Sequence, residues 1–365
     1  MSKHNPKNER IKRRYFAYLK EAKRNDEQTV DAVAKALSRF ESYTKYRDFK
    51  SFHIQQAINF KKHLTSQVAI RSGKSLSKAT LSSTLSHLKR FYLWLAGQPG
   101  FRSALQYSDA EYFNLSEKET RIAGARRTRP SPTIEQIKRV INEMPCETSI
   151  EKRNRALIAF TLLTGARDMA IASFKLKHVD LDRKLVFQDA RDVKTKFSKT
   201  FTTYFFPVGK EVEKIVTDWI VYLRNAKQAN DNHPLFPATR IEVGSSSQFE
   251  ATGLLAKHWA TASPIRRIFR QAFNDVGLPY FHPHSVRSTL TRLGMKICKS
   301  GEDFKAWSQN LGHDDVKTTY IGYGELDPVR QGEVLRHLHS TTDNGQKTSK
   351  ELLRELEVAM ERERA

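Results

Sequence analysis

The sequence contains very little cysteine. Cys146 and Cys298 are the only two in 365 residues, and no CxxC or Cys/His metal spacing surrounds either of them. A disulfide framework or a structural zinc site is therefore not expected, and both cysteines are predicted to be small core residues.

The chain also lacks an apolar run of the roughly 20 residues that cross a bilayer. Its start, MSKHNPKNERIKRRYF, has charges where a secretory signal needs apolar residues, so we expect a cytoplasmic protein with no membrane partner.

Negative charge is scarce relative to positive charge. Lys and Arg number 63 against 40 Asp and Glu, which gives a formal net charge of +23 and a pI near 9.9. A surplus of this size attracts polyanions, and the phosphate backbone of DNA is the usual partner. A lysine-rich surface without a partner, or an affinity for acidic membranes, would give the same charge, so these alternatives stay open. The length favours two domains.

The first hundred residues carry apolar stripes with the period of a helix. The stripes are Ile11, Tyr15, Tyr18 and Ala22; Val30, Val33, Leu37 and Phe40; and Leu81, Leu85, Leu88, Tyr92 and Leu95. They predict a compact helical domain over about residues 8–115. The opposite faces are basic, through Lys12, Arg13, Arg14, Lys20, Lys74, Lys78, Lys89 and Arg90. This repetition favours phosphate contact over a merely solvated surface. Because few residues precede the first stripe, we expect no separate arm-type DNA-binding domain.

A polar, basic stretch follows at residues 116–131, where Gly124 and Pro130 interrupt any helical pattern. It is predicted to be an interdomain linker. Thr133 followed by Gln136 then resembles a capping box that opens a helix. A second domain is therefore predicted over residues 132–345.

The second domain mixes helices with a few strands. Two strand-like runs, 185–187 and 200–208, flank a lysine-rich turn, and residues 240–252 are predicted to be a surface loop. Residues 346–365 are predicted to be a charged tail helix with one apolar side, which must dock on its own body or on a neighbour.

Four short motifs in the second domain carry residues suited to phosphodiester chemistry. They are Thr-Gly-x-Arg at 164–167, Pro-His-x-x-Arg at 283–287, Leu-Gly-His at 311–313, and the tyrosines Tyr320 and Tyr323 after Thr318-Thr319. Breaking a phosphodiester without a metal needs a nucleophile, cationic groups around phosphorus and an acid for the leaving oxygen. Arginine suits the second task because its planar fork holds two phosphate oxygens.

With these motifs in this order, the second domain resembles the tyrosine recombinase family, also called the phage integrase family. The resemblance implies a mostly α fold with a small antiparallel β-sheet. It further implies a two-domain clamp, in which a helical N-terminal core-binding domain and a tyrosine-recombinase catalytic domain enclose DNA. No cofactor and no metal are implied.

The resemblance also implies a role for each motif residue. Arg167 and Arg287 would hold the non-bridging oxygens of the scissile phosphate, while His284 and His313 would hydrogen-bond it or move protons. A lysine of the hairpin would protonate the leaving 5′ oxygen. Tyr323 would attack phosphorus and form a 3′-phosphotyrosine link.

Two positions depart from the family pattern, and the choice of lysine has alternatives. The nucleophile usually lies nine residues after the Leu-Gly-His histidine, where this chain has Gly322, so we prefer the adjacent Tyr323 to Tyr320. Lys199 is the preferred acid because it lies eight residues before Pro207, a spacing usual in the family. The other two hairpin lysines, Lys194 and Lys196, remain alternatives. Ala170 stands where the family commonly has an acidic residue, so another group must support the first arginine.

The resemblance implies a site-specific recombinase, or integrase, of a mobile element or chromosome. Its partners would be double-stranded DNA with specific recombination sites and three further copies of the chain, a tetramer that exchanges strands through a Holliday junction. Accessory DNA-bending proteins are an open option, and the tail helix is a candidate for exchange between protomers. Two alternatives remain: a type IB topoisomerase-like enzyme that relaxes DNA, and a catalytically inactive DNA-binding relative. Each motif residue, taken singly, also has an ordinary structural explanation as a cap, a surface pair or a core side chain.

Overall fold

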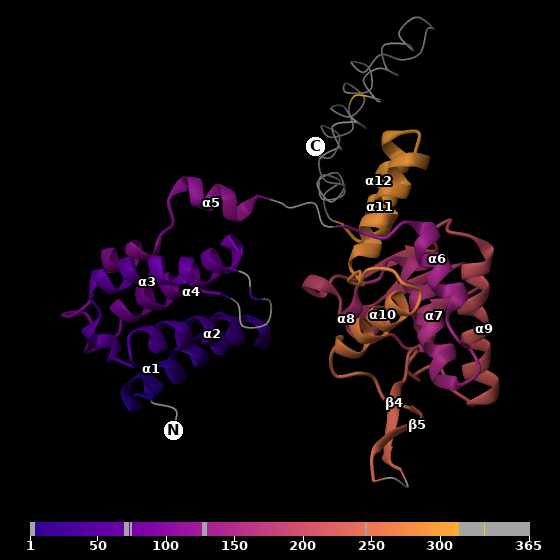
Figure 1. Ribbon diagram of the computed structural model, residues 1–365, viewed down its shortest axis with the longest axis horizontal. Helices are drawn as coiled ribbons and strands as arrows, with labels where there is room; N and C mark the ends of the chain where they lie inside the picture. Colours follow the sequence, from indigo (N-terminus) through magenta and orange to yellow (C-terminus); the bar gives the residue numbers. More distant parts are fainter. Residues whose placement is uncertain are drawn as a thin grey trace, which may run out of the picture. The chain divides into compact units, whose positions relative to one another are not determined.

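The structure is mostly helical and divides into two compact units, Met1–Arg126 and Arg127–Ala365 (Figure 1). It is a computed structural model and describes residues 4–68, 73, 75–125, 130–244, 247–313 and 332. The predicted fold class, mostly α with small antiparallel β-structure, is confirmed. Within the described residues, no helix combines the length and apolar character needed to span a bilayer.

The first unit is built from helices around an aromatic core. Its elements are α1 (Pro6–Ala17), a π-helical turn (Tyr18–Ala22), α2 (Glu27–Tyr43), α3 (Ile54–Ser66), α4 (Lys78–Ala96) and α5 (Glu117–Gly124), with 3-10 turns at Phe49–Ser51 and Tyr107–Phe113. The ring of Phe40 packs edge-on against Phe60 with centroids 5.0 Å apart, and Tyr92 lies 4.2 Å from Phe52. The predicted stripes supply this core, except that Ala22 is exposed where the first helix ends in its π-helical turn.

Helix α5 occupies part of the stretch predicted to be a linker. Ser116 and Glu119 form a capping box, which satisfies backbone N–H groups at the helix start. None of the residues of α5 is buried, so the helix has no apolar period to reveal it in the sequence. It packs on α4. The prediction of a structureless connection therefore missed this helix.

The second unit surrounds a buried central helix. Its elements are α6 (Ile134–Glu143), α7 (Ser149–Thr164), α8 (Asp168–Ile171), β1 (Val179–Asp180), β2 (Leu185–Gln188), β3 (Phe201–Tyr204), α9 (Lys210–Ala226), β4 (Ala238–Val243), β5 (Phe249–Leu255), α10 (Ser263–Asp275), α11 (Ser285–Ile297) and α12 (Gly301–Asn310), with 3-10 turns at Leu176–His178 and Lys196–Ser198. The second half of α7 is buried on all sides, as expected of a helix that is apolar all round. The three strands β1, β2 and β3 form an antiparallel sheet in that order, with Val186 paired to Thr203.

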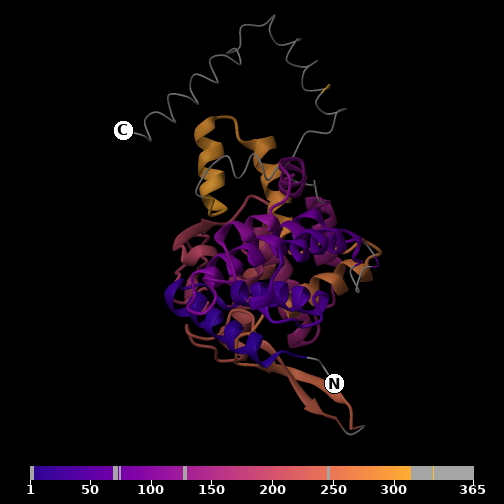
Figure 2. The same cartoon turned by 90° about the vertical axis from the view of Figure 1, so that its left-hand side faces the viewer.

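Two predictions about the second unit are wrong. Within the predicted loop 240–252, residues 240–243 and 249–252 belong to a β-ribbon of β4 and β5, and Figure 2 shows the ribbon extending from the helices of its unit. Its cross-strand pairs Ile241–Ala251 and Val243–Phe249 lie on one face, and such pairs stabilise a ribbon although the sequence there is polar and contains glycine. The cysteines are not core residues either, since Cys146 is exposed and Cys298 only half-buried.

Candidate active site

Arg287 occupies the centre of the candidate active site. It lies in the first turn of α11 and is only 5% exposed. Its NH1 group donates to the carbonyl of Gly165 at 2.7 Å, and NH2 donates to the carbonyl of Leu311 at 2.5 Å. NH2 also lies 2.8 Å from Nε2 of His313. Burial, together with the charge of Arg167, lowers the pKa of Arg287 to about 9, so the group stays protonated at neutral pH.

The Thr-Gly-x-Arg motif forms the turn that ends α7. Gly165 has φ of +60°, a left-handed conformation that favours glycine. A Cβ atom there would lie 2.9 Å from Leu290 Cδ1, so the close packing of the turn against α11 also requires glycine. The Thr164 hydroxyl closes the turn by accepting the N–H of Ala166 at 3.2 Å. The turn thus presents one carbonyl to Arg287 and places Arg167 directly before α8.

The Leu-Gly-His motif forms the equivalent turn after α12. Gly312 has φ of +68°, and the N–H of His313 donates to the carbonyl of Ser308 at 3.2 Å, as in a Schellman cap. A Cβ at Gly312 would lie 2.5 Å from Cζ of Phe201, so the turn packs closely on the start of β3. The turn places Nε2 of His313 at 2.8 Å from NH2 of Arg287.

His284 precedes α11 and lies one helical turn before Arg287. Its N–H donates to Nδ1 of His282 at 3.1 Å, so the off-pattern His282 has a contact with the motif. Desolvation by the surrounding protein, together with the charges of Arg287 and Arg167, lowers the pKa of His284 to about 4. His284 is therefore neutral at pH 7. The charge of Arg167 thus lowers the pKa of both His284 and Arg287.

The lysine-rich hairpin joins β2 to β3 beside this cluster. Asn310 at the end of α12 accepts the N–H of Tyr204 at 2.6 Å and donates to its carbonyl at 2.9 Å, which fixes β3 against the turn that carries His313. Lys199 lies two residues before β3, Lys196 opens a 3-10 turn, and Lys194 donates its N–H to Ser173 Oγ at 2.9 Å. The choice of Lys199 over Lys194 and Lys196 as the acid stays a prediction.

The acidic residue next to Arg167 is engaged elsewhere. Asp168 accepts from Nε of Arg266 on α10 at 2.8 Å, and NH2 of the same arginine lies 2.8 Å away. Ala170, which stands where the family has an acidic residue, is buried in the core. Asp168 is thus paired with Arg266, and the buried Ala170 offers no carboxylate to Arg167.

Some expected site residues lie outside the described part of the chain. Tyr320 and Tyr323 are among them, and so is the predicted tail helix at 346–365. The choice between the two tyrosines and the exchange of the tail stay predictions.

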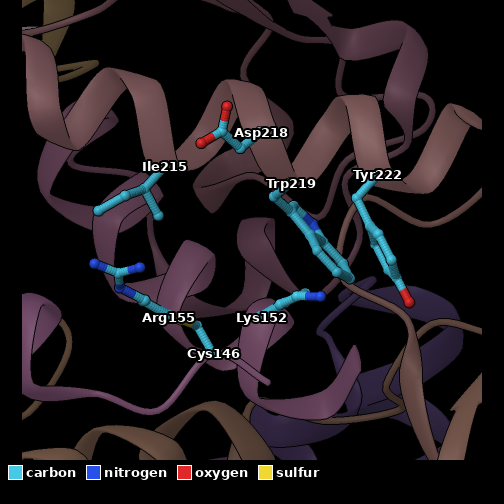
Figure 3. A pocket seen from close by; sticks show the side chains of 7 residues that line it. All are labelled: Cys146, Lys152, Arg155, Ile215, Asp218, Trp219 and Tyr222. Atoms are coloured by element: carbon cyan, nitrogen blue, oxygen red, sulfur yellow. The ribbon is translucent and has the colours of Figure 1, made fainter. Parts of the chain in front are cut away.

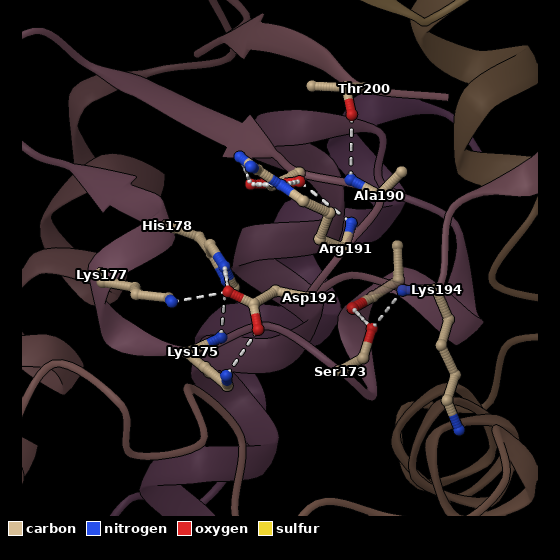
Figure 4. Close-up of polar contacts among 11 residues, drawn as sticks. Ser173, Lys175, Lys177, His178, Ala190, Arg191, Asp192, Lys194 and Thr200 are labelled. Atoms are coloured by element: carbon tan, nitrogen blue, oxygen red, sulfur yellow. Dashed lines mark hydrogen bonds and ion pairs between the residues drawn. The ribbon is translucent and has the colours of Figure 1, made fainter. Parts of the chain in front are cut away.

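Sequence reasoning missed the residues that support the cluster. Asn310 and Ser173 bind the hairpin from outside it, and Asp192 within the hairpin pairs with Lys175 and Lys177 (Figure 4). No local spacing marks these residues, because their partners lie far away along the chain. The only hint was their position within or beside the motifs.

A surface pocket of the second unit contains none of the predicted site residues. Figure 3 shows its lining: Cys146, Lys152, Arg155, Ile215, Asp218, Trp219 and Tyr222. The rings of Trp219 and Tyr222 stack there with centroids 5.7 Å apart. In the described part of the chain, no group of three or more His, Cys, Asp and Glu side chains is arranged to hold a metal ion.

Arg287 and His313 are thus in contact, His284 lies one helical turn before Arg287, and Arg167 lies two residues after Gly165, whose carbonyl Arg287 binds; these four residues are called the Arg287 cluster. Two guanidinium groups and two imidazoles are suited to bind a tetrahedral anion such as a phosphodiester. The cluster and the helical first unit define a class of protein that acts on a polyanion.

Comparison with known proteins identifies the family. Residues 133–329 match the model of the phage integrase family, which is more than half of the chain. Tyrosine recombinase XerC of Lactobacillus delbrueckii subsp. bulgaricus is 23% identical over 252 residues, 69% of this chain and 74% of that protein. XerC of Stutzerimonas stutzeri is 20% identical over 334 residues, 92% of this chain and 97% of that protein.

Solved structures show the same fold. XerH recombinase, bound to a palindromic difH substrate, has a TM-score of 0.59 and 18% identity, with 89% of this chain and 84% of that chain covered. Lambda integrase (75–356), bound to a COC′ core site, has a TM-score of 0.58 and 14% identity, with 87% and 97% covered. The chain belongs to the phage integrase family, and it is a tyrosine-type site-specific recombinase, an enzyme that transfers DNA strands.

Proposed function

We propose that the chain cleaves and rejoins double-stranded DNA at specific sites through a covalent 3′-phosphotyrosine intermediate. The observation that carries this proposal is the convergence of Gly165, Leu311 and His313 on the buried guanidinium of Arg287. None of these three partners is negatively charged, so they do not neutralise the buried guanidinium. A phosphate supplies the missing negative charge, which supports a phosphodiester as the ligand.

The proposed step is an in-line displacement at phosphorus. The Tyr323 oxygen forms a bond to phosphorus while the bond from phosphorus to the 5′ oxygen breaks. Arg167 and Arg287 hold the non-bridging oxygens, and Lys199 gives its proton to the leaving 5′ oxygen. His284 is neutral and has a lone pair for the phenol proton. The ester keeps the bond energy, so attack by a 5′ hydroxyl reseals the strand without a nucleotide cofactor.

The same proposal includes a partner and an assembly. XerH and lambda integrase are described in complex with DNA substrates, and we propose specific duplex sites for this chain as well. Strand exchange through a Holliday junction then needs four protomers around two duplexes, with residues 346–365 passed to a neighbour in a cyclic arrangement. A chain truncated after Gln346 should bind DNA and fail to pair two sites, measured by gel shift and by recombination of a two-site plasmid. Unchanged recombination by the truncated chain would refute the exchange of the tail.

A nicked suicide duplex tests the covalent step. Wild-type protein should form a covalent protein–DNA adduct that survives denaturing electrophoresis, Tyr323→Phe should form none, and the matched control Tyr320→Phe should form it normally. Adduct formed by Tyr323→Phe and lost in Tyr320→Phe would transfer the role to Tyr320. Absence of adduct in all three proteins would overturn the proposed function. Relaxation of a plasmid that lacks the recombination site would favour the topoisomerase-like alternative.

A further inference from the structure

The carboxylate of Asp192 fastens the loop between β2 and β3, residues 189–200, to the protein. Figure 4 shows Asp192 between two lysines: Oδ1 lies 2.7 Å from Nζ of Lys175, and Oδ2 lies 2.5 Å from Nζ of Lys177. Hydrogen bonds from Lys175 and Lys177 lower the pKa of Asp192, so the carboxylate is ionised at neutral pH. Asp192 therefore joins the loop to the 3-10 turn at Leu176–His178 and the residue before it.

His178 adds a third group to the same carboxylate. Its Nδ1 accepts the N–H of Lys175 at 2.9 Å, so the proton of the neutral imidazole is on Nε2. Nε2 lies 3.6 Å from Asp192 Oδ2, beyond hydrogen-bond distance, and has no hydrogen-bond partner within the described residues. The ring is 3% exposed, and burial lowers its pKa. The polar edge of this buried ring thus points at Asp192.

A second tether lies two residues further along the loop. The side chain of Val193 is buried, and the N–H of Lys194 donates to Ser173 Oγ, while the same hydroxyl donates to the carbonyl of Ala170 at 3.0 Å. Ala170 belongs to α8, the helix that begins directly after Arg167. The first half of the loop is therefore bonded to the segment that follows the Thr-Gly-x-Arg motif.

The second half of the loop has a different character. Phe197 is 83% exposed and has φ of +61°, and Ser198 has φ of +51°. The loop also carries Lys194, Lys196 and Lys199, which have the same sign of charge as Lys175 and Lys177. Loss of the Asp192 charge would leave like charges on both sides of this contact, and like charges repel.

We propose that Asp192 is a positioning residue, which holds the loop of residues 189–200 against Lys175 and Lys177 so that a loop lysine reaches the leaving 5′ oxygen. This inference rests on the proposed function, because it needs a lysine that acts as the acid. Asp192 itself touches no reacting atom. Its loss impairs protonation of the leaving group and leaves the Arg287 cluster intact.

The test compares Asp192→Asn with Asp189→Asn on two substrates. Both changes raise the net charge by the same amount, but Asp189 pairs with Arg191 of its own loop, at 2.6 Å, and fastens nothing outside it. One substrate is the nicked duplex with a normal phosphodiester, and the other has sulfur in place of the bridging 5′ oxygen. A thiolate leaves without protonation, so the second substrate does not need the acid.

Asp192→Asn should slow adduct formation on the normal duplex by about 10²-fold, the scale of a misplaced catalytic group. It should cleave the sulfur-containing duplex at close to the wild-type rate, and Asp189→Asn should behave as wild type on both. Equal slowing of Asp192→Asn on both duplexes would overturn the inference, as would normal cleavage of the phosphodiester. Wild-type protein that cleaves neither duplex would instead refute the proposed function, so the two failures are distinguishable.

Discussion

At the scale of single residues, the hydrogen-bond donors of Arg287 divide into two sets. NH1 donates once and NH2 twice, to Gly165, Leu311 and His313. A guanidinium has five N–H groups, so the Nε–H and one NH1–H remain beyond these contacts. If Nε2 of His313 accepts from Arg287, its proton is on Nδ1, which then serves as a further donor. Within the described residues, these contacts thus use three of the five N–H groups of Arg287.

Arg287→Lys is expected to abolish most of the cleavage. A lysine has one nitrogen and cannot hold both carbonyls and a phosphate, so we expect adduct formation to fall about 10²–10³-fold. The measurement is the rate of adduct formation on a nicked duplex, with thermal unfolding to check the fold. Arg183→Lys, at an exposed position near the turn between β1 and β2, serves as the control and should cleave normally. A normal rate for Arg287→Lys would show that the fork is not needed.

His284 should make stability depend on pH. Its pKa is lowered from 6.5 to about 4 in the folded protein, so between these values the unfolded chain binds the extra proton. Stability must therefore fall as the pH falls from 6.5 to 4, and the contribution is fully present above 6.5. His284→Asn lacks this group. The wild-type melting temperature minus that of the variant should therefore decrease as the pH falls from 6.5 to 4. A difference independent of pH would contradict the lowered pKa.

At the scale of elements, two glycine turns bring the ends of α7 and α12 to α11. Gly165 and Gly312 both have positive φ, and both are packed too closely for a Cβ atom. The carbonyl of Gly165 accepts from Arg287, and so does the carbonyl of Leu311, the residue before Gly312. His313, the residue after Gly312, also contacts Arg287, so the two turns fix the surroundings of the guanidinium. The motif glycines therefore belong to the site although they have no side chain.

Gly165→Ala should destabilise the protein and slow cleavage. The left-handed backbone costs about 1–3 kcal/mol for a residue with a Cβ, and the contact with Leu290 adds to this. Gly277→Ala is the matched control, because Gly277 also has positive φ, +72°, but nothing lies within 4 Å of its Cβ position. Urea unfolding of both variants separates the backbone cost from the packing cost. Equal destabilisation of the two would show that the contact with Leu290 contributes nothing.

The elements were predicted from the sequence to different degrees. The stripes of α2 and α4 gave core residues such as Leu37 and Leu88, because an apolar period reports burial directly. Helix α5 and the β4–β5 ribbon were missed, since α5 buries no residue and the ribbon alternates polar with exposed apolar residues. Burial decides whether a periodic pattern appears at all.

At the scale of the whole molecule, the positive charge is not uniformly available to DNA. In the first unit, Lys12 contacts Glu41 at 2.6 Å and Lys20 contacts Glu27 at 2.9 Å. Arg13, which lies between Lys12 and Lys20 in the sequence, is exposed. Net charge therefore overstates the number of cations that face a partner.

Binding to DNA should weaken steeply with salt, because each neutralised phosphate contributes a slope of about −0.9 in log K against log salt. Arg13→Gln should reduce the magnitude of that slope by about 1. Lys12→Gln is the control: it leaves the buried Glu41 without its cation, so it should lower stability and leave the slope unchanged. Titrations of a labelled duplex at several salt concentrations measure both. A slope near zero for wild-type protein would exclude phosphate contacts as the main source of affinity.

The sequence by itself determined the family and the candidate residues Arg167, His284, Arg287 and His313, because each motif is a short local pattern whose spacing survives without knowledge of the fold. Only the tertiary structure decided how they meet. The carbonyl that holds Arg287 lies 122 residues away at Gly165, and the carboxylate that fastens the lysine loop contacts a turn outside the loop. Such contacts depend on the path of the chain and on packing between elements, which no local period encodes.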